Sequence, residues 1–236
     1  MSTIKRRLRK INEVFECSEM PCGGVVLMDT TCFGRDWGIV VPMDSTTGKK
    51  LWRKYVKHEK MIDYEEGVDY ILSRNYQIRG MVCDGMKGIF KRFSAYPVQL
   101  CQYHQIAVIR RYLTLNPKLE AGKELWILVK QLPKFTKNEF VVQFEAWENK
   151  WLSFLRERSI DSRTDKSYFT HKKLRSAWLS IKNNLPYLFV FEKIESMPNT
   201  NNGLEGTFTA LKNKLRNHSG MSKENRKRFI DGFLKA

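Results

Sequence analysis

Long apolar runs are absent from this sequence, and none approaches the ~18 residues of a membrane-spanning helix. The basic stretch at residues 5–10 is not followed by the apolar core of a secretory signal, so secretion is not expected. Cysteines are few, five in 236 residues, and too scattered for a disulfide scaffold. We therefore expect a protein of the reducing cytoplasm with no membrane partner.

Acidic residues are scarce relative to basic ones. The chain has 25 Asp and Glu against 42 Lys and Arg, a formal net charge of +17. Such an excess favours a polyanionic partner, most commonly nucleic acid; a generally basic protein without that partner is the alternative. A hydrophobic content of 42% argues against a disordered basic tail. The length suits one domain with a large insertion or two small domains.

Two short apolar runs end on an aspartate: residues 25–28 lead into Asp29, and residues 81–83 lead into Asp84. Such runs are typical of strands buried on both faces. A carboxylate at the exit of such a strand lies where sheet proteins place their chemistry. The remaining pattern predicts strands at 37–41, 50–57 and 97–101, a helix at 63–74 with Asp63 as N-cap, and a helix at 86–93.

The order of these elements is three meandering strands, then helix, strand, helix and strand. This order is typical of a ribonuclease-H-like α/β fold, a mixed sheet flanked by helices. In such a sheet the first and fourth strands can be neighbours, which would bring Asp29 and Asp84 together.

From residue 118 to about 194 the apolar periodicity becomes helical. The sheet has no room for these helices, so we expect an all-α insertion with its own small core. The predicted divisions are a basic N-terminal segment (1–22), the first part of the core (23–115), the insertion (116–197) and the last part of the core (198–236). We expect Pro186 to end the third of three apolar stripes. The stripes are Leu125, Leu128 and Leu132; Phe140, Phe144, Trp147, Trp151 and Phe154; and Leu174, Trp178, Ile181 and Leu185.

Two cysteine patterns have metal-site spacing. Cys101-x-x-His104 follows the fifth predicted strand, but an obvious second half-site is lacking. The alternative is structural, with Cys101 buried and His104 hydrogen-bonded at the start of the next helix. Cys17 and Cys22 are either half of a zinc site or free thiols.

Residues 199–206 read Asn-Thr-Asn-Asn-Gly-Leu-Glu-Gly and lead into a helix. The structural interpretation is a capping box, with Asn202 as N-cap and Glu205 reaching back to its amide. Against it, the same helix carries Lys212, Lys214 and Arg216 beyond that single carboxylate, with Lys212 on the same face as Glu205. A metal ligand followed by phosphate-binding cations would suit DNA cleavage.

Asp29, Asp84 and Glu205 are the candidate catalytic residues. Phosphodiester cleavage and strand transfer use two divalent cations about 4 Å apart. Magnesium prefers oxygen ligands and keeps several waters, so a few carboxylates suffice, and manganese can substitute for it. We predict that Asp29 bridges the two ions and that Asp84 and Glu205 each hold one.

Four motifs in this order resemble the DDE transposases of bacterial insertion sequences, in the branch related to Mutator elements. They are residues 27–31 (Leu-Met-Asp-Thr-Thr), 82–85 (Val-Cys-Asp-Gly), 101–105 (Cys-Gln-Tyr-His-Gln) and 199–206. The resemblance runs from about residue 24 to the C-terminus. It implies a ribonuclease-H-like fold with a helical insertion before the Glu. It also implies Asp29, Asp84 and Glu205 as a catalytic triad working with Mg²⁺, and the branch's Cys-x-x-His motif at Cys101 and His104.

The resemblance further implies metal-dependent strand cleavage and strand transfer at the ends of an insertion sequence. DNA would be the partner, bound by a homodimer or higher oligomer in the nucleoid-associated cytoplasm, with Lys212, Lys214 and Arg216 as DNA-binding residues. Such transposases usually begin with a separate DNA-binding domain, whereas only residues 1–22 precede the first strand here. A catalytic core without that domain is therefore expected. The alternatives are a truncated, non-catalytic DNA-binding remnant that regulates a full-length enzyme, and a ribonuclease-H-like nuclease without strand transfer.

Overall fold

The computed structural model describes residues 19–235. Most of the predicted basic segment 1–22, together with Cys17, lies outside the described residues. Cys22 is an exposed free thiol. Within residues 19–235, no helix is both long and apolar enough to cross a bilayer.

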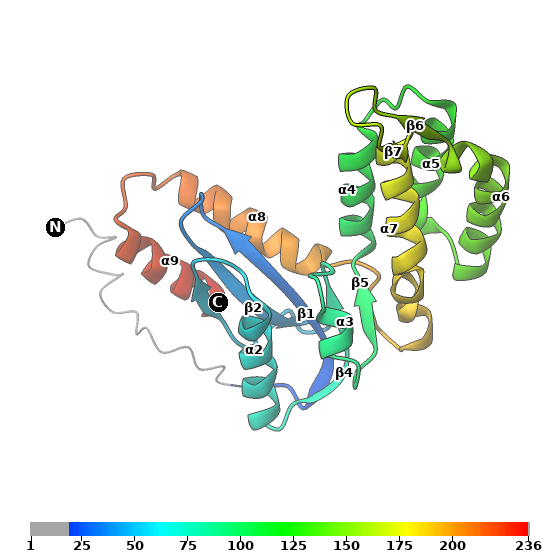
Figure 1. The fold of residues 1–236 in the computed structure, drawn as a ribbon. Helices are drawn as coiled ribbons and strands as arrows, with labels where there is room; N and C mark the ends of the chain where they lie inside the picture. Colours follow the sequence, from blue (N-terminus) through cyan, green and yellow to red (C-terminus); the bar gives the residue numbers. More distant parts are fainter. Residues whose placement is uncertain (1–18, 236) are drawn as a thin grey trace. The chain divides into compact units, whose positions relative to one another are not determined.

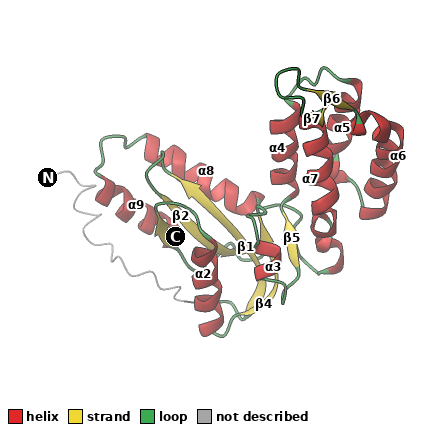
Figure 2. Cartoon of the chain, in the orientation of Figure 1, coloured by secondary structure: helices red, strands yellow, loops and turns green. Residues whose placement is uncertain are grey.

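The chain divides into two compact units. The first comprises the residues up to Val98 together with those from Ser196 onward, and the second is Gln99–Glu195. Figure 2 shows the strands of the sheet in the first unit and mainly helices in the second. The second unit starts before the predicted boundary at residue 116, because α4 (Gln102–Leu113) packs against the other helices of that unit.

A mixed sheet organises the first unit (Figure 1). Its strands in residues 19–235 follow the order β3-β2-β1-β4-β5. β1 is central, antiparallel to β2 and parallel to β4. The predicted adjacency of the first and fourth strands is therefore confirmed. The strands are β1 (Gly23–Cys32), β2 (Gly38–Asp44), β3 (Lys54–Val56), β4 (Gln77–Cys83) and β5 (Val98–Leu100).

β1 is longer than predicted. It was expected to end at Asp29-Thr30, but it continues to Cys32 because it forms a hairpin with β2, in which Asp29 lies opposite Val41. Its parallel pairing with β4 ends earlier, at Leu27 opposite Val82. Asp29 therefore lies inside β1 but just beyond the last β1–β4 pair.

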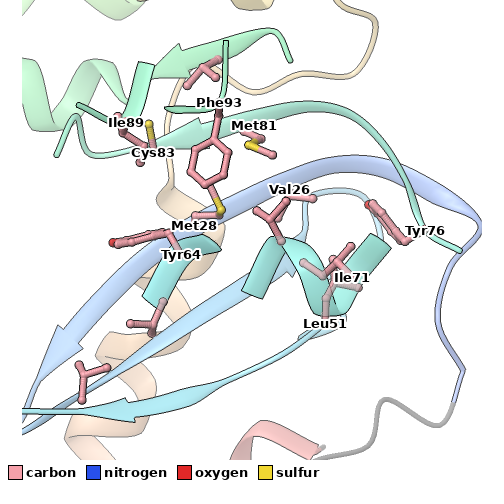
Figure 3. Packing of buried hydrophobic residues seen from close by; sticks show 14 residues of the cluster. Val26, Met28, Leu51, Tyr64, Ile71, Tyr76, Met81, Cys83, Ile89 and Phe93 are labelled. Carbon is pink, nitrogen blue, oxygen red and sulfur yellow. The ribbon is translucent and has the colours of Figure 1, made fainter. Parts of the chain in front are cut away.

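Helices cover both faces of this sheet, which confirms the predicted mixed α/β architecture. On one face, Val26 and Met28 of β1 join a core cluster with side chains of α2 (Met61–Ser73), and Ile89 of α3 (Ile89–Arg92) belongs to the same cluster (Figure 3). The opposite face carries α8 (Asn202–Arg216), which runs alongside β1 in Figure 1.

The first turn of α8 packs on the sheet at Gly203. A Cβ atom on this glycine would lie 3.6 Å from Leu27 Cδ1 and 3.4 Å from Met43 Cε. Side chains alternate between the two faces of a strand. Asp29, two residues after Leu27, therefore shares the α8 face.

Two helices of the first unit begin elsewhere than predicted. The N-cap of α2 is Lys60, and Asp63 is the third helical residue, whose Oδ2 accepts a hydrogen bond from Lys60 N at 3.0 Å. A carboxylate at this position satisfies an otherwise unpaired amide of the first turn as well as an N-cap does. α3 is shorter than the predicted 86–93. It begins at Ile89, because Gly88 has a left-handed φ of 90° that a right-handed helix cannot include.

The second unit has the predicted helical core. α5 (Glu120–Lys130), α6 (Lys137–Arg156) and α7 (Lys172–Leu188) carry the three apolar stripes. The prediction that Pro186 stops this helix is wrong, since α7 continues for two residues to Leu188. Short 3-10 helices, η1 (Leu132–Lys134) and η2 (Val190–Lys193), follow α5 and α7.

The prediction of an all-α insertion is wrong in one place. β6 (Arg158–Ile160) and β7 (Ser167–Phe169) form an antiparallel hairpin between α6 and α7. Asp161 stabilises the turn between the two strands. Its Oδ1 accepts a hydrogen bond from Arg163 N at 2.9 Å, and its backbone carbonyl oxygen accepts one from Asp165 N. The strands are too short and too exposed to give an apolar alternation in the sequence.

The C-terminal helix α9 (Lys223–Lys235) is attached to the β3 end of the sheet by buried polar groups. Asp231 forms an ion pair with Arg53 at 2.8 Å, and both side chains are at most 5% exposed. The Tyr55 hydroxyl lies 2.6 Å from Asp231 Oδ1 and 2.9 Å from the Lys227 carbonyl oxygen. A charge-paired contact of this kind holds α9 in one position along β3.

Candidate active site

Asp29 occupies the centre of the first unit. Its side chain is buried, with 7% of the residue exposed, and its Oδ1 accepts a hydrogen bond from Thr30 N at 2.7 Å. Leu27 pairs with Val82 across β1 and β4. Asp29 and Asp84 each lie two residues further, so they occupy matching positions on neighbouring parallel chains and face the same side.

Asp84 follows the last residue of β4 and is half-buried. Its Oδ1 accepts from Met86 N at 3.2 Å, which orients the carboxyl at the start of the turn. Gly85, with φ of 85°, adopts the left-handed conformation that this turn requires. The carboxylate is thus fixed at the edge where β4 leaves β1.

Glu205 does not belong to the predicted capping box. α8 begins at Asn202, its N-cap is Asn201, and no side chain caps it. The Asn201 side chain is fully buried and donates from Nδ2 to the Met28 carbonyl oxygen at 3.1 Å. Asn201 therefore ties the start of α8 to β1 next to Asp29, and Glu205 lies in the first turn of the helix as a half-buried residue.

The three predicted acids interact electrostatically. The pKa of Asp29 is raised to about 8, mainly by burial and then by the nearby charge of Asp84. Glu205 and Glu59 raise it further, whereas the hydrogen bond from the Thr30 amide lowers it. Like charges in a desolvated site disfavour ionisation of each other. A divalent cation would remove this repulsion, and carboxylate oxygens are the ligands that Mg²⁺ prefers. The donor set therefore fits a divalent metal.

Glu59 was missed by sequence reasoning. It precedes α2, and its carboxylate accepts a hydrogen bond from the Tyr64 hydroxyl. That hydroxyl also lies 3.1 Å from Thr30 Oγ1. Burial, with Glu59 and Asp84, raises the pKa of Tyr64 far above its usual value, so the group remains a donor. Glu59 lies in a polar loop at no strand end, and no sequence pattern marks it.

Cys101 and His104 lie in the second unit, whereas the three acids belong to the first. Cys101 is buried immediately before α4, and His104 is half-buried in the first turn of that helix. The Cys101 sulfur and a His104 ring nitrogen lie within 4.8 Å of each other. The burial of Cys101 agrees with the structural alternative, and the metal half-site stays a prediction.

The predicted DNA-binding residues lie at the C-terminal end of α8. Lys214 and Arg216 are exposed, and Lys212 is half-buried. Lys214 Nζ lies 5.0 Å from the centroid of the Phe233 ring, which links α8 to α9. Cations at this end also complement the helix dipole, so their position serves the helix whether or not they contact phosphate.

Asp29→Asn is expected to stabilise the metal-free protein increasingly as pH rises. Between pH ~4 and the raised pKa of about 8, folded Asp29 holds a proton that the unfolded chain releases. The free energy of unfolding therefore falls as pH rises across this interval, and the amide removes this loss. We expect a gain near zero at pH 4 and about 5 kcal/mol at pH 8, measured by chemical denaturation in EDTA.

The matched control is Asp69→Asn, which removes an exposed carboxylate from α2. Its effect on unfolding should be small and nearly independent of pH. An Asp29→Asn protein that loses stability relative to the parent as pH rises would contradict the raised pKa.

The first unit thus holds Asp84 and Glu205 near enough to the buried Asp29 for their charges to raise its pKa, and Glu59 adds to this effect. Such a group of oxygen ligands can bind divalent cations and neutralise charge on a phosphodiester. No protein-family model matches the sequence, and no curated protein matches it significantly.

Proposed function

We propose that this protein is a metal-dependent DNA transposase of the DDE class, which cleaves and transfers DNA strands at the ends of an insertion sequence. The observation that carries the proposal is the electrostatic coupling of Asp29 with Asp84 and Glu205, acids that lie far apart in the chain. The central position of β1 between β2 and β4, with two covered faces, supports a ribonuclease-H-like fold.

Asp29, Asp84 and Glu205 would hold the Mg²⁺ ions. When bound, the ions would neutralise the phosphate charge and activate the attacking hydroxyl or water. The chain's own residues supply the positioning. Thr30 N orients the Asp29 carboxyl, and Asn201 holds the start of α8 against β1.

DNA is the proposed partner, and the protein would act on it as a homodimer or higher oligomer, because two element ends must be joined. The net charge of +17 supports a polyanionic substrate. Lys212, Lys214 and Arg216 lie on the helix that carries Glu205, so phosphate contacts there would be coupled to the acidic site.

Cleavage of a DNA duplex tests the proposal directly. The substrate carries the DNA that flanks the coding sequence, with any inverted repeats it contains, and the products are resolved on a denaturing gel. We expect strand breaks at the repeat ends with Mg²⁺ or Mn²⁺ and none with EDTA. Tight DNA binding without cleavage, in either metal, would instead support the non-catalytic DNA-binding alternative.

Lys212→Ala is expected to weaken binding of the same duplex without affecting the binding of Mn²⁺. Loss of one phosphate contact should reduce the slope of log K against log salt concentration by about 1. Fluorescence anisotropy at several salt concentrations measures the slope. Lys118→Ala, an exposed lysine of the second unit, is the control. An unchanged slope for Lys212→Ala would show that this side chain does not contact phosphate.

A further inference from the structure

A second candidate binding site lies in the first unit and does not include the acidic residues. It is a cavity of about 370 Å³ between the turn that precedes β2, the end of β3 and the first turns of α9. This volume lies within the range of small-ligand pockets. We call it the α9 pocket; its lining residues are Asp36, Trp37, Tyr55, Val56, Lys57, Lys223 and Lys227.

The described lining of the α9 pocket is cationic. Lys57, Lys223 and Lys227 contribute ammonium groups, and Asp36 contributes a carboxylate. Within residues 19–235, none of these lysines forms an ion pair with a carboxylate. By contrast, Lys54 on the neighbouring strand β3 pairs with Asp63 and Glu66. The excess of unpaired positive charge predicts an anionic ligand.

Aromatic rings form the apolar part of the lining. Lys227 Nζ lies 4.8 Å from the centroid of the Tyr55 ring, and Lys223 Nζ lies 5.9 Å from that of Trp37. The two lysines are four residues apart on α9 and therefore on one helical face. A ligand that carries both a negative charge and a flat ring matches this pairing of ammonium groups with aromatic rings.

The aromatic side of the pocket is held in place. The Tyr55 hydroxyl is fixed by Asp231 and by the Lys227 carbonyl oxygen. Trp37 is 8% exposed and packs on Phe33, with ring centroids 4.6 Å apart. A preformed pocket loses little conformational entropy when a ligand enters.

We propose that the α9 pocket binds one nucleotide of a single DNA strand, with Lys223 and Lys227 at the phosphate and the base against the aromatic lining. The identity of the strand as DNA rests on the proposed function. The pocket itself is independent of the acidic residues, and it would fix the path of a strand along the β3 side of the first unit.

Photocrosslinking to the intact protein tests the contact without a variant. A 12-nucleotide single strand with 5-iodouracil at one internal position is irradiated with the protein in EDTA, and the crosslinked peptides are identified by mass spectrometry. We expect crosslinks at Trp37 or Tyr55. Crosslinks confined to other segments would overturn the proposal.

Competition experiments distinguish a DNA strand from a free nucleotide or another anion as the ligand of the pocket. Unlabelled single-stranded DNA should abolish the crosslink, whereas thymidine monophosphate and polyglutamate at the same phosphate or carboxylate concentration should leave most of it. If the mononucleotide competes as efficiently as the strand, the ligand of the pocket is a free nucleotide, and the proposal of a bound strand is overturned. Competition by polyglutamate would show a general anion site and overturn the proposal.

Lys223→Ala with Lys227→Ala is the matched variant. Lys223 is exposed and Lys227 is half-buried, and neither belongs to the apolar core. We therefore expect a folded protein with single-strand affinity reduced at least tenfold and a salt slope smaller by about 1.4. The control, Lys118→Ala with Lys193→Ala, removes the same charge from exposed positions of the second unit. Equal losses in both doubles would reduce the effect to net charge and overturn a specific pocket.

Cleavage at the acidic residues and crosslinking at the α9 pocket distinguish failure of the proposed function from failure of the pocket proposal. Metal-dependent cleavage would need these residues, whereas the crosslink in EDTA would not. If cleavage is absent in the parent but the crosslink at the α9 pocket is present, the proposed function fails and the pocket stands. If cleavage is present and the crosslink is absent, the pocket fails alone.

Discussion

Replacing Asp29, Asp84 or Glu205 by the corresponding amide is expected to lower the metal-dependent DNA cleavage rate by about 1,000-fold in each case. Each carboxylate would bind a divalent cation, and the ions contribute several kcal/mol of stabilisation to the developing phosphate charge. A loss of about 4 kcal/mol corresponds to three factors of ten in rate. The measurement is the single-turnover rate in Mg²⁺ at a protein concentration that saturates the DNA.

Two controls give this prediction its meaning. Asp69→Asn removes an exposed carboxylate from α2 and should leave the rate unchanged. Glu59→Gln keeps an acceptor for the Tyr64 hydroxyl but removes one of the charges that raise the pKa of Asp29. The rate is expected to stay within about tenfold of the parent there, because removing this like charge favours the ionised form of Asp29. If all three amide variants cleave as fast as the parent, the site assignment is wrong.

The effects of the amide substitutions should not add. Residues that hold the same ions act as a unit, so removing a second carboxylate costs little once the first is gone. The double variant Asp29→Asn with Asp84→Asn should therefore cleave about as slowly as Asp29→Asn alone. Independent losses that multiply would indicate that the two acids do not share a metal site.

Asp231→Ala is expected to give the largest loss of stability among single substitutions in α9, about 3–5 kcal/mol. It removes the carboxylate that lies 2.8 Å from the buried Arg53 guanidinium, and it removes an acceptor from the Tyr55 hydroxyl. Breaking a buried ion pair from one side costs more than the pair contributes, because the remaining charge stays desolvated. Urea denaturation monitored by tryptophan fluorescence measures the change.

The double variant Arg53→Met with Asp231→Leu distinguishes this cause from a general effect of mutating α9. It removes both charges and fills the space, so it should recover most of the stability. Glu224→Ala breaks the exposed pair with Arg228 and should cost less than about 0.5 kcal/mol. A loss for Asp231→Ala no larger than that of Glu224→Ala would show that the ion pair does not hold α9.

Much of the fold was accessible from local patterns. The apolar run before Asp29 and the stripes of α5, α6 and α7 follow from side-chain alternation and helical periodicity, which act over a few residues. The errors occurred where distant contacts decide. β1 extends to Cys32 because β2 pairs with it, and the β6–β7 hairpin has no apolar alternation to detect.

The candidate site was predictable in its members but not in its support. Asp29 and Asp84 follow apolar runs, and Glu205 lies in a motif, so each could be named from the sequence. Asn201 was not named, because its role requires the Met28 carbonyl oxygen, 173 positions away in the chain. Glu59 was not named for the same reason, since only packing brings its charge near Asp29.

The sequence by itself therefore determined the positive charge, the two strands that end near acids, and the helical character of the second unit. These properties depend on composition and on neighbours along the chain. Only the tertiary structure decided that Asn201, bonded to β1, is the N-cap of α8 in place of a capping box at Asn202. It also decided that burial raises the pKa of Asp29 and that α9 forms a cationic pocket with β3. Each of these depends on desolvation or on contacts between distant segments, and neither is encoded in the spacing of residues.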